Sequence, residues 1–535
     1  MGTFNVVDLF SGAGGLSLGF KQTGKVNIVA AAENNLSARK TYKRNFKLTR
    51  LYSDVRTIDY TELRNAVGDV DIVIGGPPCQ GFSNANRQHS TIVSMNNRLV
   101  KEYVRAICEL RPKAFVMENV AMLRSQVHKF LVEEKDLDDE RIMALNLSID
   151  KIEILPKCVN FDNSIVFLKS KQTEKGYAWV ENFYKIINTL YRYRINSEKF
   201  DITIEKHKGK LIKQLNEIIN LIGVSDNINI LQQYDVRMAT EILRYIDQKS
   251  NFNETILAIT NSIMVQRAIM RINELANNNI HIFEYREENG SLVAVVKSYP
   301  VLDYIRAILE NEPYNYILSE NTLNAIHYGA PQRRERFIIV GIKKELNAKY
   351  VAPEIKFTEE NYRTVYDAIA DIQDVTPSTE LTGDYIELEA HPNAIGLEKE
   401  LRGRALYNHI VTATRTTAMT RFKALKAGEN FHDLDPTLKT TYSNVDRTQN
   451  TIYMRLKYNE PSGTVVNVRK SMWIHPKLDR AISIREAARL QTFPDSFIFE
   501  GTKDSQYQQV GNAVPPYLAK AIAESVIRIL NNVKE

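Results

Sequence analysis

The sequence predicts an α/β fold built on a doubly wound parallel sheet, and three features of the chain indicate it. Short apolar runs at 4–8, 28–32, 70–74, 114–117 and 336–341 have the length of buried strands. Helical stretches separate several of these runs, and glycine-rich or polar turns follow them. Because parallel sheets bind ligands at the carboxyl ends of their strands, we expect the functional residues in these turns.

Length and composition restrict the class of protein. A chain of 535 residues needs more than one domain or large insertions. No run of about 18 apolar residues and no signal sequence is apparent, so we expect a cytoplasmic protein with no membrane partner. The three cysteines, Cys79, Cys108 and Cys158, lack the spacing of a zinc site or a disulfide framework, so no metal is expected.

Residues 125–300 interrupt the strand series with long helical segments. Leu211, Leu215, Ile218 and Ile222 recur at helical spacing, which predicts a helix that ends near Gly223. Within the segment, 169–213 carries 11 basic and 5 acidic residues among several aromatic ones. Two interpretations stay open. Either five cations contact DNA phosphates, or the aromatics form the core of a self-contained helical subdomain; the five are Arg192, Arg194, Lys206, Lys208 and Lys210.

Charge is distributed unevenly in the last third of the chain. Residues 350–400 carry 3 basic and 12 acidic residues, whereas 401–480 carry 14 basic and 6 acidic ones. Only the second segment is suited to a nucleic-acid surface, and the alternative is a solvated basic face.

The segment DLFSGAGGLSLGF at 8–20 predicts a ligand site at the first turn. Gly12 and Gly14 allow a ligand to approach the backbone closely, and Asp8 with Phe10 suits a cationic, adenosine-bearing ligand. Glu33 follows the next strand at the spacing of a ribose acceptor, and Asp54 is placed to accept from an adenine amino group. For the glycine-rich segment the alternative is a tight turn without a ligand. For each acidic residue taken alone, the alternative is an ordinary helix cap.

The segment GGPPCQGFS at 75–83 presents Cys79 in a loop stiffened by prolines, which suits a nucleophile. Glu118, in ENV after the strand at 114–117, is a candidate proton donor if burial keeps its carboxyl partly protonated. In YGAPQRRERF at 328–337, Arg334 and Arg336 are two residues apart on an extended run. We expect them to point the same way and hold an oxygen or phosphate.

In this order, and with REAARLQTFPDSF at 485–497 and QVGNAVPP at 509–516, the motifs resemble those of the cytosine-5 DNA methyltransferases. The resemblance covers 1–123, about 300–341 and about 450–535. It implies a Rossmann-like methyltransferase fold that uses S-adenosylmethionine, with a smaller target-recognition domain and a mostly helical insertion. The implied parts are a catalytic domain at 1–124 and 301–345, the insertion at 125–300, a target-recognition domain at 346–497 and a returning segment at 498–535.

The resemblance also implies roles for single residues. Cys79 adds to carbon 6 of a flipped-out cytosine, Glu118 engages ring nitrogen 3, and Arg334 anchors the base with support from Gln332 and Arg336. The implied cofactor pocket comprises Asp8, Phe10, Gly12, Gly14, Glu33, Asn34, Asp54, Pro78, Leu99 and Asn512. For DNA reading, the basic segment offers Arg402, Arg404, Arg415, Arg421, Lys423, Arg447 and Arg455.

The implied substrate is a specific sequence of duplex DNA, bound by a monomer that belongs to a restriction-modification or related defence system, with cognate restriction or defence proteins as further partners. The nearest alternative is methylation of cytosine in transfer RNA. A further alternative is a catalytically silent DNA-binding or regulatory subunit, and the intact set of Cys79, Glu118, Arg334 and Arg336 argues against it. Another alternative is a nucleotide-dependent oxidoreductase, but its glycine-rich fingerprint has a third glycine at the position that Ser17 occupies here.

Overall fold

The computed structural model describes residues 3–46, 50–78, 98–124, 128–156, 178–223, 230–248, 251–442 and 444–532. They form two units. The first holds the described residues of 1–79, 98–125 and 305–535, and the second holds those of 126–304. Each unit has its own core.

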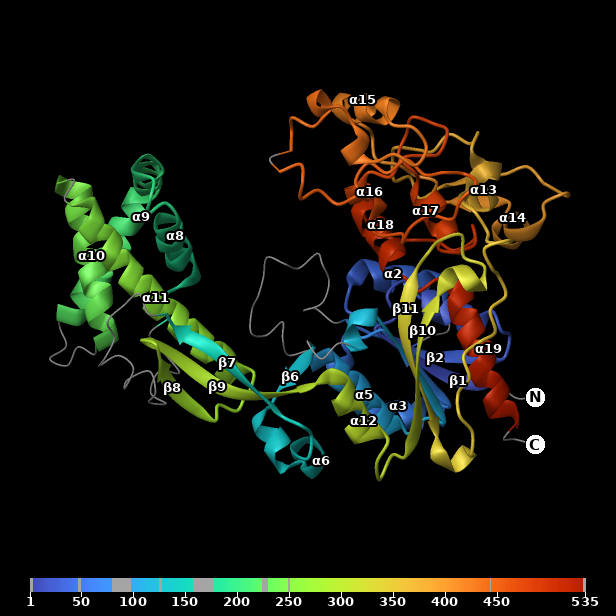
Figure 1. Cartoon of the computed structure of the whole chain (residues 1–535), viewed down its shortest axis with the longest axis horizontal. Helices are drawn as coiled ribbons and strands as arrows, with labels where there is room; N and C mark the ends of the chain where they lie inside the picture. The colour runs from blue at the N-terminus through green and yellow to red at the C-terminus, as the bar shows by residue number, and fades with distance from the viewer. Residues whose placement is uncertain are drawn as a thin grey trace. The chain divides into compact units, whose positions relative to one another are not determined.

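A seven-stranded sheet in the order β10-β11-β5-β4-β1-β2-β3 forms the centre of the first unit (Figure 1). Its strands are β1 (Phe4–Leu9), β2 (Val26–Ala32), β3 (Arg50–Tyr52), β4 (Ile72–Gly75), β5 (Ala114–Asn119), β10 (Tyr316–Asn324) and β11 (Glu335–Lys343). The five strands from β3 to β5 are parallel, as expected, but β11 pairs with β5 and β10 antiparallel. The run at 336–341 is therefore an antiparallel strand of a mixed sheet.

Helices cover both faces of this sheet, and each helix packs its apolar side against the strands. On one face, α1 (Gly15–Lys21) and α19 (Pro516–Asn532) share a core with β1, β4 and β5. On the other, α5 (Arg98–Leu110) packs beside α3 (Tyr60–Val67), and the buried Tyr103 of α5 donates to the carbonyl of Val116 at 2.8 Å. The strand order reverses between β1 and β4, so the turns after these two strands open at a topological switch point.

Residues 346–512 of the first unit form a mainly irregular region around short helices. These are α13 (Val365–Ile369), α14 (Gly396–Leu401), α15 (Thr416–Ala424), α16 (Val468–Ser471), α17 (Ile484–Leu490) and α18 (Lys503–Asn512), with an antiparallel pair of β12 (Tyr385–Glu387) and β13 (Ala405–Tyr407). Its main core includes Trp473, Phe493 and Phe497.

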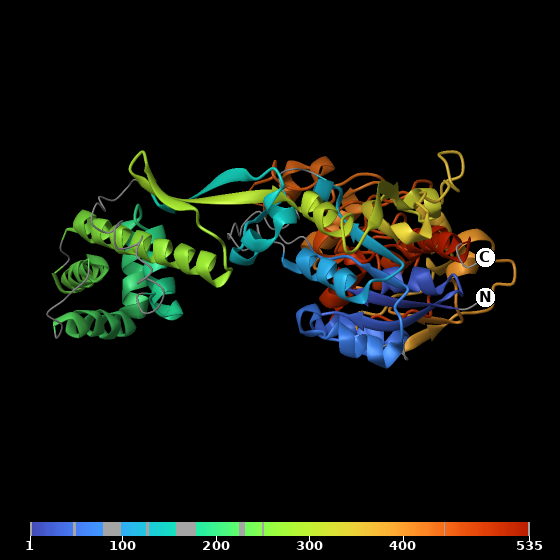
Figure 2. The ribbon, with the colours of Figure 1, turned by 90° about the horizontal axis from the view of Figure 1, so that it is seen from below.

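The second unit combines a small sheet with a helical bundle (Figure 2). The sheet contains β6 (Lys129–Leu131), β7 (Ser148–Leu155), β8 (Glu284–Glu288) and β9 (Ser291–Pro300). The bundle contains α8 (Glu181–Arg192), α9 (Ser197–Gly223), α10 (Ile230–Gln248) and α11 (Phe252–Asn277). Helix α9 contains the predicted stripe, with Leu211 and Leu215 fully buried. The sheet is an element that the sequence did not predict.

Candidate active site

The turn after β1 leaves open space at Gly12. Phe10, Gly12 and Gly14 all have positive φ angles, of 58°, 53° and 96°. A Cβ atom at Gly12 would meet nothing within 4 Å, so the backbone here is open to a ligand. The Gly12 amide donates to the Glu33 Oε2 at 2.9 Å.

Glu33 fixes this turn against the end of β2. Its Oε1 accepts from the Asn35 amide at 2.7 Å, so both carboxylate oxygens have backbone donors. Burial raises the pKa of Glu33, and the amide donors oppose that shift. Asn34 is exposed, and its carbonyl accepts from the Arg39 Nη1 at 2.7 Å. Glu33 is thus held rigidly beside the open space at Gly12.

Asp8 lies under the turn and is fully buried. Its Oδ2 accepts from the Ser17 hydroxyl at 2.6 Å, and the Ser17 hydroxyl lies 2.7 Å from that of Tyr42. Its Oδ1 has no hydrogen-bond partner. Burial, with a smaller contribution from Glu33, raises the pKa of Asp8 to about 8. A buried polar atom without a partner needs an explanation, and a bound ligand or an ordered water can supply the missing hydrogen bond.

The remaining predicted cofactor residues differ in how open they are. Asp54 caps the next short helix through the Arg56 amide and pairs with the Arg56 guanidinium at 2.6 Å, which lowers its pKa. Pro78 is exposed, and Leu99 is half-buried in the first turn of α5. Asn512 is exposed at the end of α18, where its Oδ1 accepts from Gln508 at 2.7 Å. Asp54 is therefore already engaged by its own loop.

The C-terminal helices lie directly against the first turn. A Cβ atom on Gly15 would lie 2.4 Å from the Val514 carbonyl oxygen, and one on Gly19 would lie 2.4 Å from that of Pro516. Only glycine permits this approach of α1 to α19. The segment that follows Asn512 is thus brought back beside the turn after β1.

Glu118 and Arg336 meet at the edge of the switch point. They lie on the neighbouring strands β5 and β11, and the Arg336 Nε is 2.6 Å from the Glu118 Oε1. Each side chain is 15% exposed, so the pair remains open to a ligand. A Cβ atom on Gly76 would lie 2.8 Å from the Glu118 Oε2. The glycine lets the loop that leads to residue 79 pass beside the carboxylate.

Asn119 supports this loop, a role that sequence reasoning missed. Its Nδ2 donates to the Pro77 carbonyl at 3.1 Å. The available signal was its position directly after Glu118 in the ENV motif. Cys79 itself lies outside the described residues, as does Cys158.

Arg334 has different partners from Arg336, which corrects the expectation that the two hold one group. Its side chain is 1% exposed, and its guanidinium donates to the carbonyls of Val465 at 2.8 Å and Gly511 at 2.9 Å. Burial and the nearby Arg336 lower its pKa, while Glu118 opposes the shift. Arg334 thus joins β11 to two distant segments of the chain.

Three of the predicted DNA-reading residues are structural as well. Arg421 and Arg455 are buried, and Arg402 pairs with Asp371 at 2.5 Å. Arg421 donates to the Leu438 carbonyl at 2.8 Å, and Arg455 pairs with Asp479 at 2.6 Å. The exposed members of the set are Arg404, Arg415, Lys423 and Arg447.

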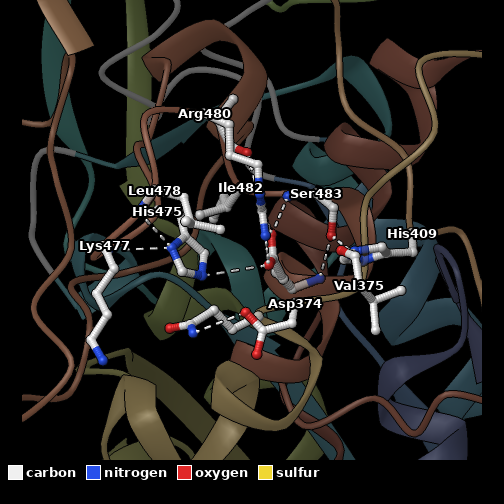
Figure 3. Close-up of polar contacts among 12 residues, drawn as sticks. Asp374, Val375, His409, His475, Lys477, Leu478, Arg480, Ile482 and Ser483 are labelled. Carbon is white, nitrogen blue, oxygen red and sulfur yellow. Dashed lines mark hydrogen bonds and ion pairs between the residues drawn. The ribbon is translucent and has the colours of Figure 1, made fainter. Parts of the chain in front are cut away.

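A buried polar network orders the segment that precedes and begins α17 (Figure 3). The Glu486 carboxylate accepts from Arg480 at 2.7 and 2.8 Å and from the Ser483 amide at 2.6 Å. The Ser483 hydroxyl lies 3.0 Å from the His409 Nδ1. The His475 Nδ1 accepts from the amides of Lys477 at 3.3 Å and Leu478 at 3.1 Å. Burial lowers the pKa of His475 to about 4, whereas the Arg480 ion pair holds that of Glu486 at about 2 despite its burial.

In the described part of the chain, no helix is long and apolar enough to cross a membrane. Nor does any group of three or more His, Cys, Asp or Glu residues there form a metal-binding arrangement.

Comparison with known proteins identifies the family. The model of the C-5 cytosine-specific DNA methylases matches residues 4–140 and 288–528, more than half of the chain. Type II methyltransferase M.DdeI of Desulfomicrobium norvegicum is 24% identical over 99% of this chain and 90% of its own. DNA (cytosine-5-)-methyltransferase M.ApeKI of Aeropyrum pernix is 26% identical over the whole of both chains.

A solved structure shares the fold. A protein described as a prophage-encoded DNA modification methyltransferase of E. coli superposes with a TM-score of 0.52 at 19% identity, over 99% of this chain and 100% of its own. With the family model matching the chain on either side of residues 141–287, this chain belongs to the C-5 cytosine-specific DNA methylase family.

Proposed function

We propose that this enzyme transfers a methyl group from S-adenosylmethionine to carbon 5 of a cytosine in a specific sequence of duplex DNA, with Cys79 as the nucleophile. The observation that carries the proposal is the Glu118–Arg336 pair beside Gly76, three residues before Cys79. The guanidinium can donate to the cytosine carbonyl oxygen, and the carboxyl group can engage ring nitrogen 3.

The chemistry needs a covalent step because carbon 5 of cytosine is a poor nucleophile. Attack of the Cys79 thiolate forms a bond to carbon 6, while ring nitrogen 3 takes a proton held by Glu118. The electron pair displaced from the ring makes carbon 5 nucleophilic. After methylation, water takes the carbon 5 proton, the electron pair of that bond expels the Cys79 thiolate, and ring nitrogen 3 returns its proton to Glu118. A base stacked in the duplex is out of reach of the thiolate, so the cytosine leaves the helix first.

The residues at the switch point fit S-adenosylmethionine, which supplies an electrophilic methyl group when it is bound. Gly12 offers open space at the end of β1, and Glu33 presents a fixed carboxylate suited to ribose hydroxyls. The unpartnered Oδ1 of Asp8 lies beneath the same turn. We assign cofactor binding to this turn, with Phe10, Gly14, Asn34, Asp54, Pro78, Leu99 and Asn512 around it.

Recognition of DNA is assigned to the exposed cations of residues 401–480. Arg415 precedes the first residue of α15, and Lys423 lies in its last turn. Arg404 and Arg447 are exposed elsewhere in the same segment. The relatives named type II methyltransferases suggest that the enzyme protects host DNA in a restriction-modification system. Bisulfite sequencing of host DNA, with and without the enzyme, tests which cytosine is modified.

Substitution of single cysteines tests the nucleophile. Cys79→Ser should abolish methyl transfer and keep binding of DNA and S-adenosylhomocysteine, because it removes the thiolate but little volume. Cys108→Ser, on α5, is the matched control and should remain active. Duplex DNA with 5-fluorocytosine at the target should form a covalent complex with the unsubstituted enzyme and with Cys108→Ser only. An active Cys79→Ser enzyme, or methylation of transfer RNA in place of DNA, would overturn the proposal.

A further inference from the structure

Helices α8 and α9 of the second unit border a basic recess that the proposed chemistry does not use. The recess has a volume of about 480 Å³. Four of the residues that line it are basic, and Glu217 is its acidic member; the four are Lys185, His207, Lys210 and Lys213. The Oε1 of Gln214, which also lines the recess, is buried without a hydrogen-bond partner.

Three of the five lysines of α9 differ from the other described lysines of this unit in having no carboxylate or aromatic ring as a partner. Between residues 126 and 304 the structure describes ten lysines, and seven of them contact a carboxylate or an aromatic ring. Those seven are Lys129, Lys135, Lys151, Lys185 and Lys208, which pair with carboxylates, and Lys199 and Lys297, which lie over rings. The three described lysines without such a contact are Lys206, Lys210 and Lys213, all exposed on α9.

Their spacing places the three charges on one side of the helix. Lys206 and Lys210 are four residues apart, and Lys210 and Lys213 are three apart, so each is the helical neighbour of the next. Like charges at these spacings destabilise a helix. Glu217, which also lines the recess, lies four residues beyond Lys213, but the structure describes no ion pair between it and these lysines. Three exposed positive charges are thus available to an anion.

The aromatic residues of the same segment do not form part of the surface. Phe183 and Phe200 are buried, and Trp179, Tyr184, Tyr191 and Tyr193 pack against the same core. Two of the five cations considered from sequence are also engaged. Arg194 lies over the Tyr191 ring, and Lys208 pairs with Glu205 at 3.3 Å. These rings therefore serve the core of the bundle, and the contact that the exposed lysines offer is electrostatic.

We propose that Lys206, Lys210 and Lys213 bind the phosphate backbone of duplex DNA and give the enzyme a second, sequence-independent hold on its substrate. The three residues span about 10 Å of helix. Phosphates follow one another about every 3.4 Å along the axis of a DNA strand, so this span matches about three of them. DNA is the polyanion that every cytosine-5 DNA methylase meets, and α9 lies within residues 141–287, between the two segments that the family model matches.

The test is the salt dependence of binding to a duplex of arbitrary sequence by the full chain. The plot of log K against log salt concentration has a negative slope. Replacing Lys206, Lys210 and Lys213 with Ala should reduce the magnitude of that slope by about two to three, since each lost phosphate contact removes about 0.9. The loss of affinity should be the same for duplexes of any sequence. Because binding is measured without methyl transfer, a failed Cys79 mechanism would leave this result unaffected.

Two control variants separate a local contact from net charge and from folding. Lys135→Ala, Lys151→Ala and Lys297→Ala together remove the same charge from the same unit and should leave the slope unchanged. Replacing the three α9 lysines with Arg should preserve it. An unchanged slope in the folded α9 Ala variant, an equal fall in the charge control, or a loss confined to one DNA sequence or to RNA would each overturn the proposal.

Discussion

Arg334 and Arg336 stand two residues apart, yet one is enclosed by carbonyl groups and the other faces Glu118. Alternation along a strand says only that both side chains leave the same face. What each arginine does depends on which segments cover it, and Val465 and Gly511, which cover Arg334, are more than 130 residues away. We propose that the base-anchoring role that the resemblance assigns to Arg334 belongs to Arg336, which is 15% exposed and faces Glu118.

Substitution of Arg336 should therefore lower activity more than stability, and substitution of Arg334 should lower stability. We expect Arg336→Ala to lower kcat by about a hundredfold or more, because it removes a charged donor from the reacting base, with little change in Tm. Arg334→Ala should instead destabilise the fold by about 3 kcal/mol, since it leaves two buried carbonyls unpaired. Methyl-transfer rates and thermal unfolding of both variants decide this. A stable, inactive Arg334→Ala enzyme would return the base-anchoring role to Arg334.

The affinity for S-adenosylhomocysteine tests the role of Glu33. We expect Glu33→Ala to raise the Kd for S-adenosylhomocysteine at least tenfold, because it removes both the ribose acceptor and the partner of the Gly12 and Asn35 amides. The exposed Glu62 of α3 provides the control, and Glu62→Ala should bind normally. Calorimetry measures both affinities, while the methylated sequence should stay the same. Normal affinity in Glu33→Ala would remove Glu33 from the pocket.

At the scale of elements, the segment that leads into α17 depends on groups that tolerate no extra proton. The Nδ1 of His475 accepts from two amides, so protonation of the ring would break both contacts. Glu486 must be ionised to accept from Arg480. Both groups have folded-state pKa values below their ordinary ones, so both favour the folded state at neutral pH and lose that effect on acidification.

We expect the free energy of unfolding to fall as the pH drops from 6.5 to about 4, the window between the ordinary and folded pKa of His475. The shift corresponds to about 3 kcal/mol. Glu486 adds a further loss between pH 4.5 and about 2. His475→Asn, which keeps an acceptor near the same place but does not titrate, should flatten the upper part of this dependence in urea titrations. The exposed His391→Asn variant is the control, and equal slopes for the two variants would contradict the prediction.

Across the whole molecule, the sequence was informative wherever function depends on residues close together in the chain. The strands at 4–8, 28–32 and 114–117, the turn at Gly12 and the placement of Glu118 follow from local patterns. The direction of β11 did not, because strand polarity depends on the path of the chain between strands. Nor could composition separate the exposed Arg415 from the buried Arg421, since both belong to the same basic segment.

Contact between the first and last helices can be tested with two glycines in helix interiors. Gly19→Ala should destabilise the protein by about 2 kcal/mol or more, because the new Cβ would lie 2.4 Å from the Pro516 carbonyl oxygen. Gly209→Ala, on α9, meets nothing within 4 Å and should be neutral or slightly stabilising. Thermal unfolding of the two variants measures the difference. Equal Tm values would show that α1 and α19 are not tightly joined.

The position of α19 on α1 also has a consequence for biosynthesis. As the chain leaves the ribosome, Leu16 and Phe20 of α1 emerge hundreds of residues before Leu518 and Ile522, the side chains that share their core. The sheet therefore cannot complete this face until translation has passed residue 522. During most of synthesis the nascent chain exposes an apolar surface, the kind of surface that chaperones bind.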